Sequence, residues 1–315
     1  MTLLKACWTA ALGAAAALTM GSAHAQTLEM EPIGAGYLTL PVMIGENGPY
    51  RFVFDTGASH TAIAQPVAEE LGFVPIQFDF DDVQSLTRRF GAERFALNDF
   101  QIAELEPVNV NAVVVPVAPD SPLIIAGLIG ADAIAPLGYR IDFANRTLDL
   151  DIHTVEFRDG LYDQERRLLY GAARIRGQSE TVRILVDSGA PYTIVNQAFR
   201  ERRQRGAAVH LRYGIYGVDN EEPEDGTQAL PLRRVQFGAV CWEIASAVRA
   251  ELDIFSALGW EDVPAMVMGM DMLSAGILTV DREVGRFDFS PATPEAACSN
   301  DRRIQYTDLT LRDPA

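Results

Sequence analysis

The sequence contains one short motif twice, in matching surroundings. Asp55-Thr56-Gly57-Ala58 and Asp187-Ser188-Gly189-Ala190 each follow three apolar residues, and a threonine stands three positions after each alanine. A second repeated segment, here called the echo, follows each copy: Leu128-Ile129-Gly130-Ala131-Asp132 follows the first, and Val267-Met268-Gly269-Met270-Asp271 follows the second. From the aspartate of the motif to the glycine of its echo is 75 residues in the first half and 82 in the second. A repeat at both places predicts a duplicated fold that brings two carboxylates together, which is a known arrangement for acid–base chemistry.

Short apolar runs separated by turn residues indicate that both halves are rich in β-strands. Residues 37–44 and 50–55 are typical of a hairpin whose second strand ends at Asp55. Residues 168–175 and 181–187 repeat this pattern and end at Asp187. Period-two alternation and β-branched residues predict further strands later in each half.

Composition narrows the class of protein. The chain has 315 residues, of which 48% are hydrophobic, enough for one large domain or two ordinary ones. Its formal charge is −17 and its sequence pI about 4.6, a balance that repels phosphate backbones and makes nucleic acid an unfavourable partner. The negative charge is otherwise typical of a soluble surface.

The first 25 residues are typical of a secretory signal peptide. Lys5 precedes an alanine-rich apolar run, and Ala23-His24-Ala25 fits the cleavage pattern, so we expect an exported protein, periplasmic or secreted, with no membrane span after cleavage. Cys241 and Cys298 then remain. In an oxidising compartment they either pair or stay two unrelated buried thiols, and the sequence leaves both open.

The repeated constellation resembles the aspartic peptidases. Members carry Asp-(Thr/Ser)-Gly and a later apolar-apolar-Gly in each lobe, and the alanine after each glycine is similar to the retroviral branch. Both copies lie in one chain here, as in pepsins. The resemblance covers roughly residues 37–290 and implies a mostly β, bilobal pepsin-like acid protease fold made of two retropepsin-like β-barrel lobes with short helices. We expect a first half at 26–155, a second half at 156–290 and a C-terminal tail at 291–315.

The same resemblance implies an aspartic endopeptidase. Asp55 and Asp187 would activate a water molecule without cofactor or metal, and a polypeptide would be the substrate, with a monomer sufficient. Thr56 and Ser188 would hydrogen-bond across the lobe boundary, and Gly57 and Gly189 would let the backbone approach the carboxylates. Gly130 and Gly269 would support the site from below, or be simple packing glycines. Because Ala58 and Ala190 provide no hydroxyl to the dyad, we expect its upper apparent pKa to exceed that of pepsin, about 4.7.

The sequence leaves the flaps that would cover a substrate open, and it leaves two functions open. The family covers its substrate with hairpin flaps, and the candidates are Tyr216 and Gly217 in the second half and residues 83–87 in the first, which lack the usual glycines. His60 follows Asp55 by five residues, but the spacing of the four histidines does not favour a metal site. The alternative function is a non-catalytic peptide-binding module on the same bilobal fold. Retention of both aspartates and both hydroxyls favours catalysis.

Overall fold

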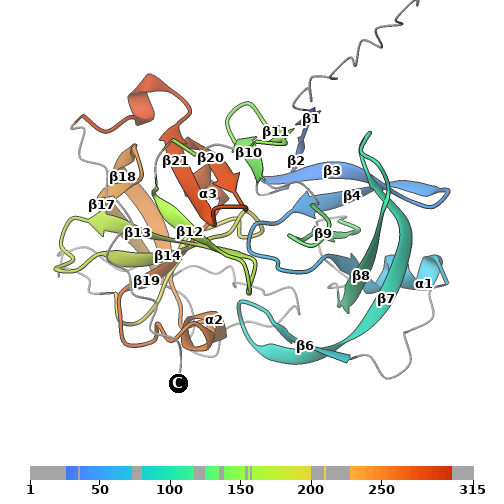
Figure 1. Cartoon of the computed structure of the whole chain (residues 1–315). Coiled ribbons are helices and arrows are strands. Elements are labelled where there is room, and N and C mark those ends of the chain that lie inside the picture. The colour runs from blue at the N-terminus through green and yellow to red at the C-terminus, as the bar shows by residue number, and fades with distance from the viewer. Residues whose placement is uncertain are drawn as a thin grey trace, which may run out of the picture.

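The computed structural model describes residues 26–34, 36–72, 80–116, 125–134, 138–152, 155–156, 158–199, 209–210 and 228–299. This part of the chain is mostly β, as expected (Figure 1). The predicted signal peptide, Tyr216, Gly217 and the end of the predicted tail lie outside it. None of the helices in the described ranges is long and apolar enough to cross a membrane.

The first half contains an eight-stranded sheet, in which the six strands from β3 to β7 form a closed barrel. Its order is β2-β3-β4-β9-β5-β8-β7-β6, and an additional pairing between β3 and β7 closes it. The short helix α1 (Gln65–Glu70) follows β5. The strands are β2 (Glu31–Ile33), β3 (Tyr37–Ile44), β4 (Asn47–Phe54), β5 (Ala62–Ala64), β6 (Phe80–Gln84), β7 (Arg89–Ile102), β8 (Val108–Val115) and β9 (Gly127–Ile129).

A thirteen-stranded sheet contains the second half together with three strands from the first. Its order is β1-β11-β10-β20-β21-β12-β13-β14-β19-β15-β18-β17-β16, with an additional pairing between β13 and β17. The strands from the first half are β1 (Thr27–Glu29), β10 (Gly138–Asp142) and β11 (Thr147–Leu150). The others are β12 (Gly160–Asp163), β13 (Leu168–Ile175), β14 (Val182–Val186), β15 (Ile194–Val195), β16 (Val209–His210), β17 (Gln228–Phe237), β18 (Val240–Arg249), β19 (Ala265–Met268), β20 (Gly276–Asp281) and β21 (Arg286–Pro291), with helices α2 (Asp253–Ala257), α3 (Met270–Leu273) and the 3-10 turn η1 (Pro294–Ala296).

The two sheets repeat one strand arrangement. The series β3-β4-β9-β5-β8-β7 of the first half corresponds to β13-β14-β19-β15-β18-β17 of the second. In both, the strand that leads to an aspartate runs parallel to the strand of the downstream echo, β4 with β9 and β14 with β19. The next short strand is antiparallel to that echo strand in each case, β5 with β9 and β15 with β19. The sequence repeat is therefore a repeat of three-dimensional structure.

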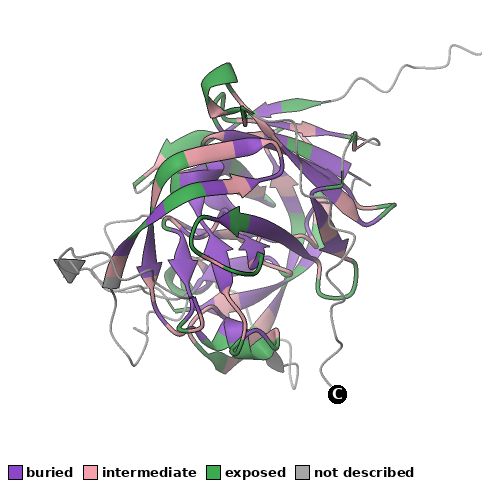
Figure 2. Ribbon diagram, turned by 90° about the vertical axis from the view of Figure 1, so that its left-hand side faces the viewer, coloured by how far each residue is buried: buried purple, intermediate pink, exposed green. Residues whose placement is uncertain are grey.

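The strand leading to each aspartate is central in its barrel, which explains its continuous apolar sequence. Phe52, Val53 and Phe54 are all buried, as are residues 184–186 in β14. Figure 2 shows buried residues (purple) along the strands in the interior of the molecule. Such a strand has neighbours on both edges and side chains packed on both faces, so it lacks the polar alternation of a surface strand. Phe52 packs edge-on against Phe100 in the first barrel, with ring centroids 5.4 Å apart.

The closing hairpin of the first half is not separate from the second half. Strand β10 pairs antiparallel with β20 over five residues, and β1 extends the sheet beyond β11. The predicted boundary near residue 155 therefore lies within a chain whose two halves share one continuous sheet.

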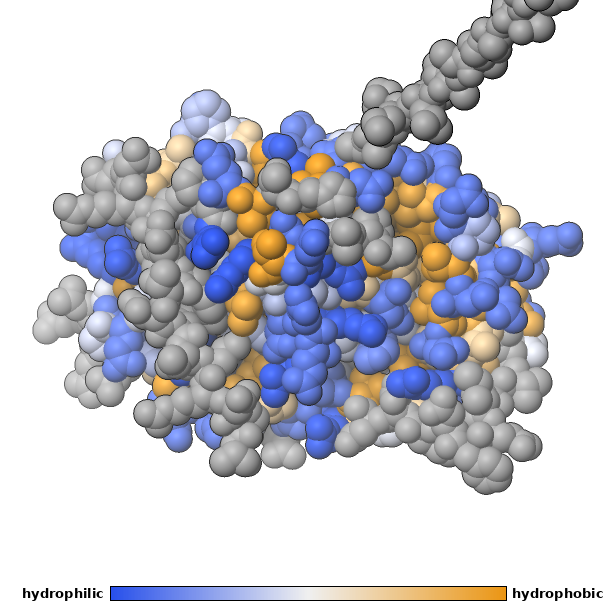
Figure 3. Space-filling view, in the orientation of Figure 1, coloured by the Kyte–Doolittle hydropathy of each residue, from blue (hydrophilic) through white to orange (hydrophobic). Residues whose placement is uncertain are grey.

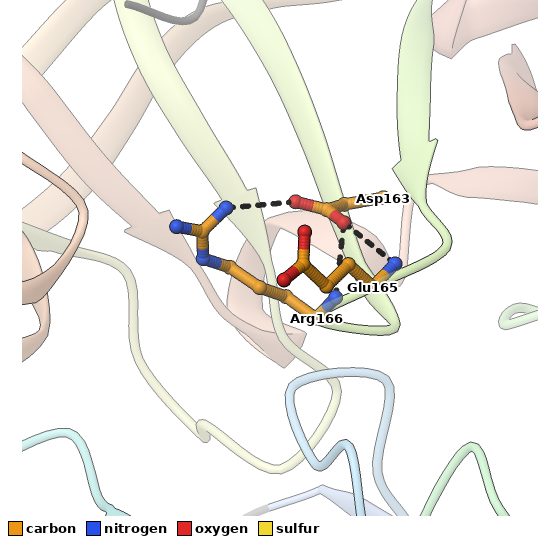
Figure 4. A network of polar contacts seen from close by, with 3 residues as sticks. All are labelled: Asp163, Glu165 and Arg166. Atoms are coloured by element: carbon orange, nitrogen blue, oxygen red, sulfur yellow. Dashed lines mark hydrogen bonds and ion pairs between the residues drawn. The ribbon is translucent and has the colours of Figure 1, made fainter. Parts of the chain in front are cut away.

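A network of polar contacts holds the turn between β12 and β13. The Asp163 carboxylate accepts from the amides of Glu165 and Arg166, both at 2.9 Å, and pairs with the Arg166 guanidinium (Figure 4).

The beginning of the predicted tail is bound to the second half. A disulfide joins Cys241 on β18 to Cys298, and the Cys298 amide donates to the Ala239 carbonyl at 3.0 Å. The sequence left this pairing open, and the structure makes it. The bond closes a loop across a sequence separation of 57.

Removing this disulfide should destabilise the protein without altering any contact between the two aspartates. For a loop of this length we expect the Cys241→Ser, Cys298→Ser double variant to lose about 2 to 4 kcal/mol of unfolding free energy, because the unfolded chain regains conformational entropy. Urea unfolding of the double variant against the oxidised and the reduced wild type measures the effect. Equal stability of all three would contradict a structural role for the bond.

Candidate active site

Asp55 and Asp187 lie at equivalent positions, immediately after β4 and β14. The Asp55 amide donates to the Ile129 carbonyl and the Asp187 amide to the Met268 carbonyl, both at 3.1 Å. Each aspartate is thus fixed by the last residue of the neighbouring echo strand. The two carboxyl groups, 132 residues apart in sequence, hydrogen-bond to each other.

The surroundings of the two carboxyl groups disfavour a second negative charge. Burial raises the pKa of Asp55, while hydrogen bonds from Asp187 and from the amides of Gly57 and Gly189 oppose this rise. Burial and then the charge of Asp55 raise the pKa of Asp187 well above its usual range. Asp187 is buried whereas Asp55 is partly exposed. Two adjacent carboxyl groups in such a place share one proton, and the deeper Asp187 is the better place for it.

Gly57 and Gly189 each lie against the carboxyl group of the aspartate from the other half, which leaves no room for a side chain at either position. A Cβ on Gly57 would lie 2.5 Å from the Asp187 carboxyl carbon, and one on Gly189 would lie 2.4 Å from the Asp55 carboxyl carbon. Each glycine amide also donates to its own aspartate at 2.8 Å. The close approach expected from the sequence is therefore reciprocal between the two halves.

Thr56 and Ser188 form four hydrogen bonds across the boundary between the halves. The Thr56 hydroxyl donates to the Val186 carbonyl and accepts from the Ser188 amide, both at 3.0 Å. The Ser188 hydroxyl donates to the Phe54 carbonyl at 2.7 Å and accepts from the Thr56 amide at 3.0 Å. Both residues are buried. This network joins the two aspartate loops directly beside the carboxyl groups.

Thr56→Val should separate the role of the hydroxyl from that of side-chain shape. The variant leaves the Ser188 amide and the Val186 carbonyl buried without a partner, so we expect a loss of roughly 2 to 4 kcal/mol in unfolding free energy. Thr56→Ser keeps the hydroxyl and should stay within about 1 kcal/mol of wild type. Urea unfolding of both variants measures the difference, and equal stability of the two would contradict the argument.

The residues of the downstream echo bind the threonine that follows each motif. The Asp132 carboxylate accepts from the Thr61 amide at 2.7 Å and from its hydroxyl at 2.8 Å, and the Thr61 hydroxyl accepts from the Gly130 amide. In the second half Thr193 donates to Asp271 at 2.7 Å and accepts from the Gly269 amide. The repeat of Thr61 with Asp132 and of Thr193 with Asp271 is visible in the sequence, but their pairing is a finding of the structure.

Gly130 and Gly269 lie at the end of the echo strand in each half, against the loop that follows the aspartate. A Cβ on Gly130 would meet the His60 backbone at 2.3 Å, and one on Gly269 would meet the Tyr192 backbone at 2.6 Å. Both glycines therefore contact the loop that carries the aspartate rather than the carboxyl group itself. His60 is exposed, and its imidazole contacts the Ser59 hydroxyl.

Comparison with known proteins agrees with this geometry. Residues 40–133 match the family model described as aspartyl protease. The matched stretch contains Asp55-Thr56-Gly57, Gly130 and Asp132, and it supports aspartic peptidase function in general terms. No curated protein matches the chain. The second copy of the motif lies beyond the match and is related to the first by the strand arrangement described above.

The stretch that matches the aspartyl protease model includes the β6–β7 hairpin, and the flap candidate at 83–87 spans the end of β6 and the turn that follows it. The turn is organised by Ser85: its hydroxyl donates to the Arg88 carbonyl at 2.9 Å and accepts from the Thr87 and Arg88 amides. Leu86 packs against a core cluster of the second half, and its carbonyl accepts from the Ile254 amide of α2 at 3.3 Å. The hairpin thus reaches from the first half to the second. The other flap candidates, Tyr216 and Gly217, lie outside the described residues.

Proposed function

We propose that the protein is an aspartic endopeptidase that hydrolyses polypeptides through Asp55 and Asp187, one from each half, without a cofactor. The observation that supports this best is the reciprocal arrangement around the two hydrogen-bonded carboxyl groups. Each half supplies an aspartate, a hydroxyl that crosses to the other half, and a glycine that makes room for the opposite carboxyl. The aspartyl protease match supports the same reaction class.

The proposed reaction uses the one shared proton. Asp55, ionised, removes a proton from a water molecule whose oxygen attacks the scissile carbonyl carbon, and Asp187 donates its proton to the carbonyl oxygen. A tetrahedral diol results. Asp55 then gives its proton to the leaving amide nitrogen, the C–N bond breaks, and the diol returns a proton to Asp187. Atoms and charges balance, and the dyad regains its starting state.

This mechanism predicts a bell-shaped pH dependence at mildly acidic pH. Activity is lost at low pH when both carboxyl groups are protonated, and at high pH when the second one ionises. Because burial and the neighbouring charge raise the pKa of Asp187, the high-pH limb lies above that of an ordinary aspartate. Ala58 and Ala190 provide no hydroxyl to lower it, so we expect it above the value of pepsin, about 4.7.

The test of the proposed function is cleavage of denatured casein from pH 3 to 7, with and without pepstatin. We expect cleavage with a maximum inside this range. A rate that still rises as the pH falls to 3, as it would for a maximum near pH 2, would contradict the proposed pKa order. Binding of peptides without cleavage at any pH would instead establish the non-catalytic peptide-binding function.

We also propose that the protein is exported and acts as a monomer. The Cys241–Cys298 disulfide is typical of an oxidising compartment, and residues 1–25 have the pattern of a signal peptide. On the face seen in Figure 3, hydrophilic residues (blue) lie between the apolar areas (orange). Both motif copies lie in one chain, so no second copy is needed to complete the dyad.

A further inference from the structure

Tyr37 lies at the beginning of β3, beside the strand that leads to Asp55. In the β3–β4 pairing Thr39 is opposite Val53 and Leu40 is opposite Phe52. Continuing this antiparallel register by two residues puts Tyr37 opposite Asp55, with both side chains on the same face of the sheet. The mechanism above gives this tyrosine no role.

The Tyr37 side chain is close enough to both Asp55 and Asp187 for their charges to affect its pKa. Burial raises the pKa of the Tyr37 hydroxyl, and the charges of Asp187 and Asp55 raise it further. The hydroxyl therefore stays protonated wherever the dyad is active and is a permanent hydrogen-bond donor. None of the residues in the described ranges hydrogen-bonds to the Tyr37 side chain, which is partly buried.

A second tyrosine approaches from the other half. Tyr192 stands five residues after Asp187 and is close enough to Tyr37 to influence its pKa. Tyr192 is 52% exposed and is one of three large hydrophobic side chains exposed in the described ranges, with Ile244 and Val284. Its backbone lies against Gly269, and the adjacent Pro191 carbonyl accepts from the Asp271 amide at 3.2 Å. A firmly held backbone thus presents an exposed aromatic ring near the dyad.

We infer that Tyr37 is a substrate-binding residue, whose hydroxyl donates a hydrogen bond to a main-chain carbonyl of the bound polypeptide next to the scissile bond. Tyr192 covers the neighbouring part of the same peptide with its ring, because an exposed aromatic ring at such a place favours contact with a ligand. This inference rests on the proposed function and extends it, since it names a group that fixes the peptide relative to the carboxyl groups. A purely structural Tyr37 would act through its ring alone.

Tyr37→Phe separates the hydroxyl from the ring, and Tyr50→Phe is the matched control. Tyr50 is on the adjacent strand β4 of the same half, and its pKa is raised by burial and then by the charge of Glu70 rather than by the two aspartates. Binding is measured in an Asp187→Asn background, where the peptide is not consumed. The probe is a fluorescein-labelled casein peptide that the wild type cleaves, and polarisation gives its dissociation constant.

We expect Tyr37→Phe to weaken peptide binding about 5- to 10-fold, the effect of one lost hydrogen bond, and to lower kcat/KM of the otherwise wild-type enzyme by a similar factor. Thermal unfolding and the pH of maximum activity should not change, because the ring remains and the hydroxyl does not titrate there. Tyr50→Phe should leave binding and kcat/KM within about 2-fold of their reference values.

Two contrary outcomes can be told apart. If the wild type cleaves and Tyr37→Phe binds and cleaves as well as Tyr50→Phe, Tyr37 has no substrate contact and this inference is overturned while the proposed function stands. If the wild type cleaves nothing and no peptide binds, the proposed function fails and the inference fails with it.

Discussion

Asp187→Asn is expected to abolish peptide hydrolysis and, at the same time, to stabilise the fold at neutral pH. The asparagine can accept the Gly189 amide, as the Asp187 carboxylate does at 2.8 Å, but it cannot donate and recover the shared proton. We expect kcat/KM for casein peptides to fall by at least about 10³-fold. A variant that still cleaves within about tenfold of wild type would exclude the dyad mechanism.

The stabilisation follows from the direction of the pKa shift. The folded protein raises the pKa of Asp187 above its unfolded value of about 3.9, so this group favours folding most below that pH. The favourable contribution is lost as the pH rises through the folded-state pKa. Asparagine does not titrate, so the variant avoids the loss, and its advantage over wild type should grow from pH 4 to pH 7.

Thermal unfolding of wild type and variant at several pH values measures this change. The control is Asp262→Asn, which removes an exposed carboxylate from the same half and should give no such trend. If Asp187→Asn were less stable than wild type at pH 7, ionisation of the buried Asp187 would not destabilise the fold.

Gly189→Ala is expected to have the second largest effect on activity. The added Cβ would lie 2.3 Å from one oxygen of the Asp55 carboxyl group and 2.4 Å from its carbon, closer than real contacts allow. The carboxyl group must move, and a displacement on the order of 1 Å in a catalytic group costs about 100-fold in rate. The overpacking should also cost roughly 1 to 3 kcal/mol of stability.

Gly91→Ala is the matched control for this substitution. A Cβ at Gly91 on β7 meets nothing within 4 Å. This variant should therefore keep wild-type stability and activity. Steady-state kinetics and urea unfolding of both variants give the comparison, and a Gly189→Ala enzyme as active as Gly91→Ala would refute the steric argument.

Local sequence patterns were sufficient to predict the mostly β fold and to select the two aspartates. Three apolar residues before an Asp-(Thr/Ser)-Gly indicate a central strand that ends at a carboxylate, and the second copy indicates a duplication. Each of these patterns can be recognised in the sequence because it involves residues that are only a few positions apart. The segment 83–87 contains no glycine, and the contacts that organise its turn, from the Ser85 hydroxyl to the Arg88 carbonyl and amide, are not indicated by the local sequence.

Only the tertiary structure decided which distant groups meet. The partners of Thr56 and Ser188 lie 130 to 134 residues away, and the bonds of Thr61 to Asp132 span 71. The Cys241–Cys298 bond, the contact of Leu86 with α2 and the position of Tyr37 near both carboxyl groups likewise depend on strand register and packing. The sequence thus determined the chemical groups and the strands that carry them. Their mutual distances, and with them the raised pKa values of Asp55 and Asp187, arise only when the two halves pack together, because burial and contact are properties of the whole fold.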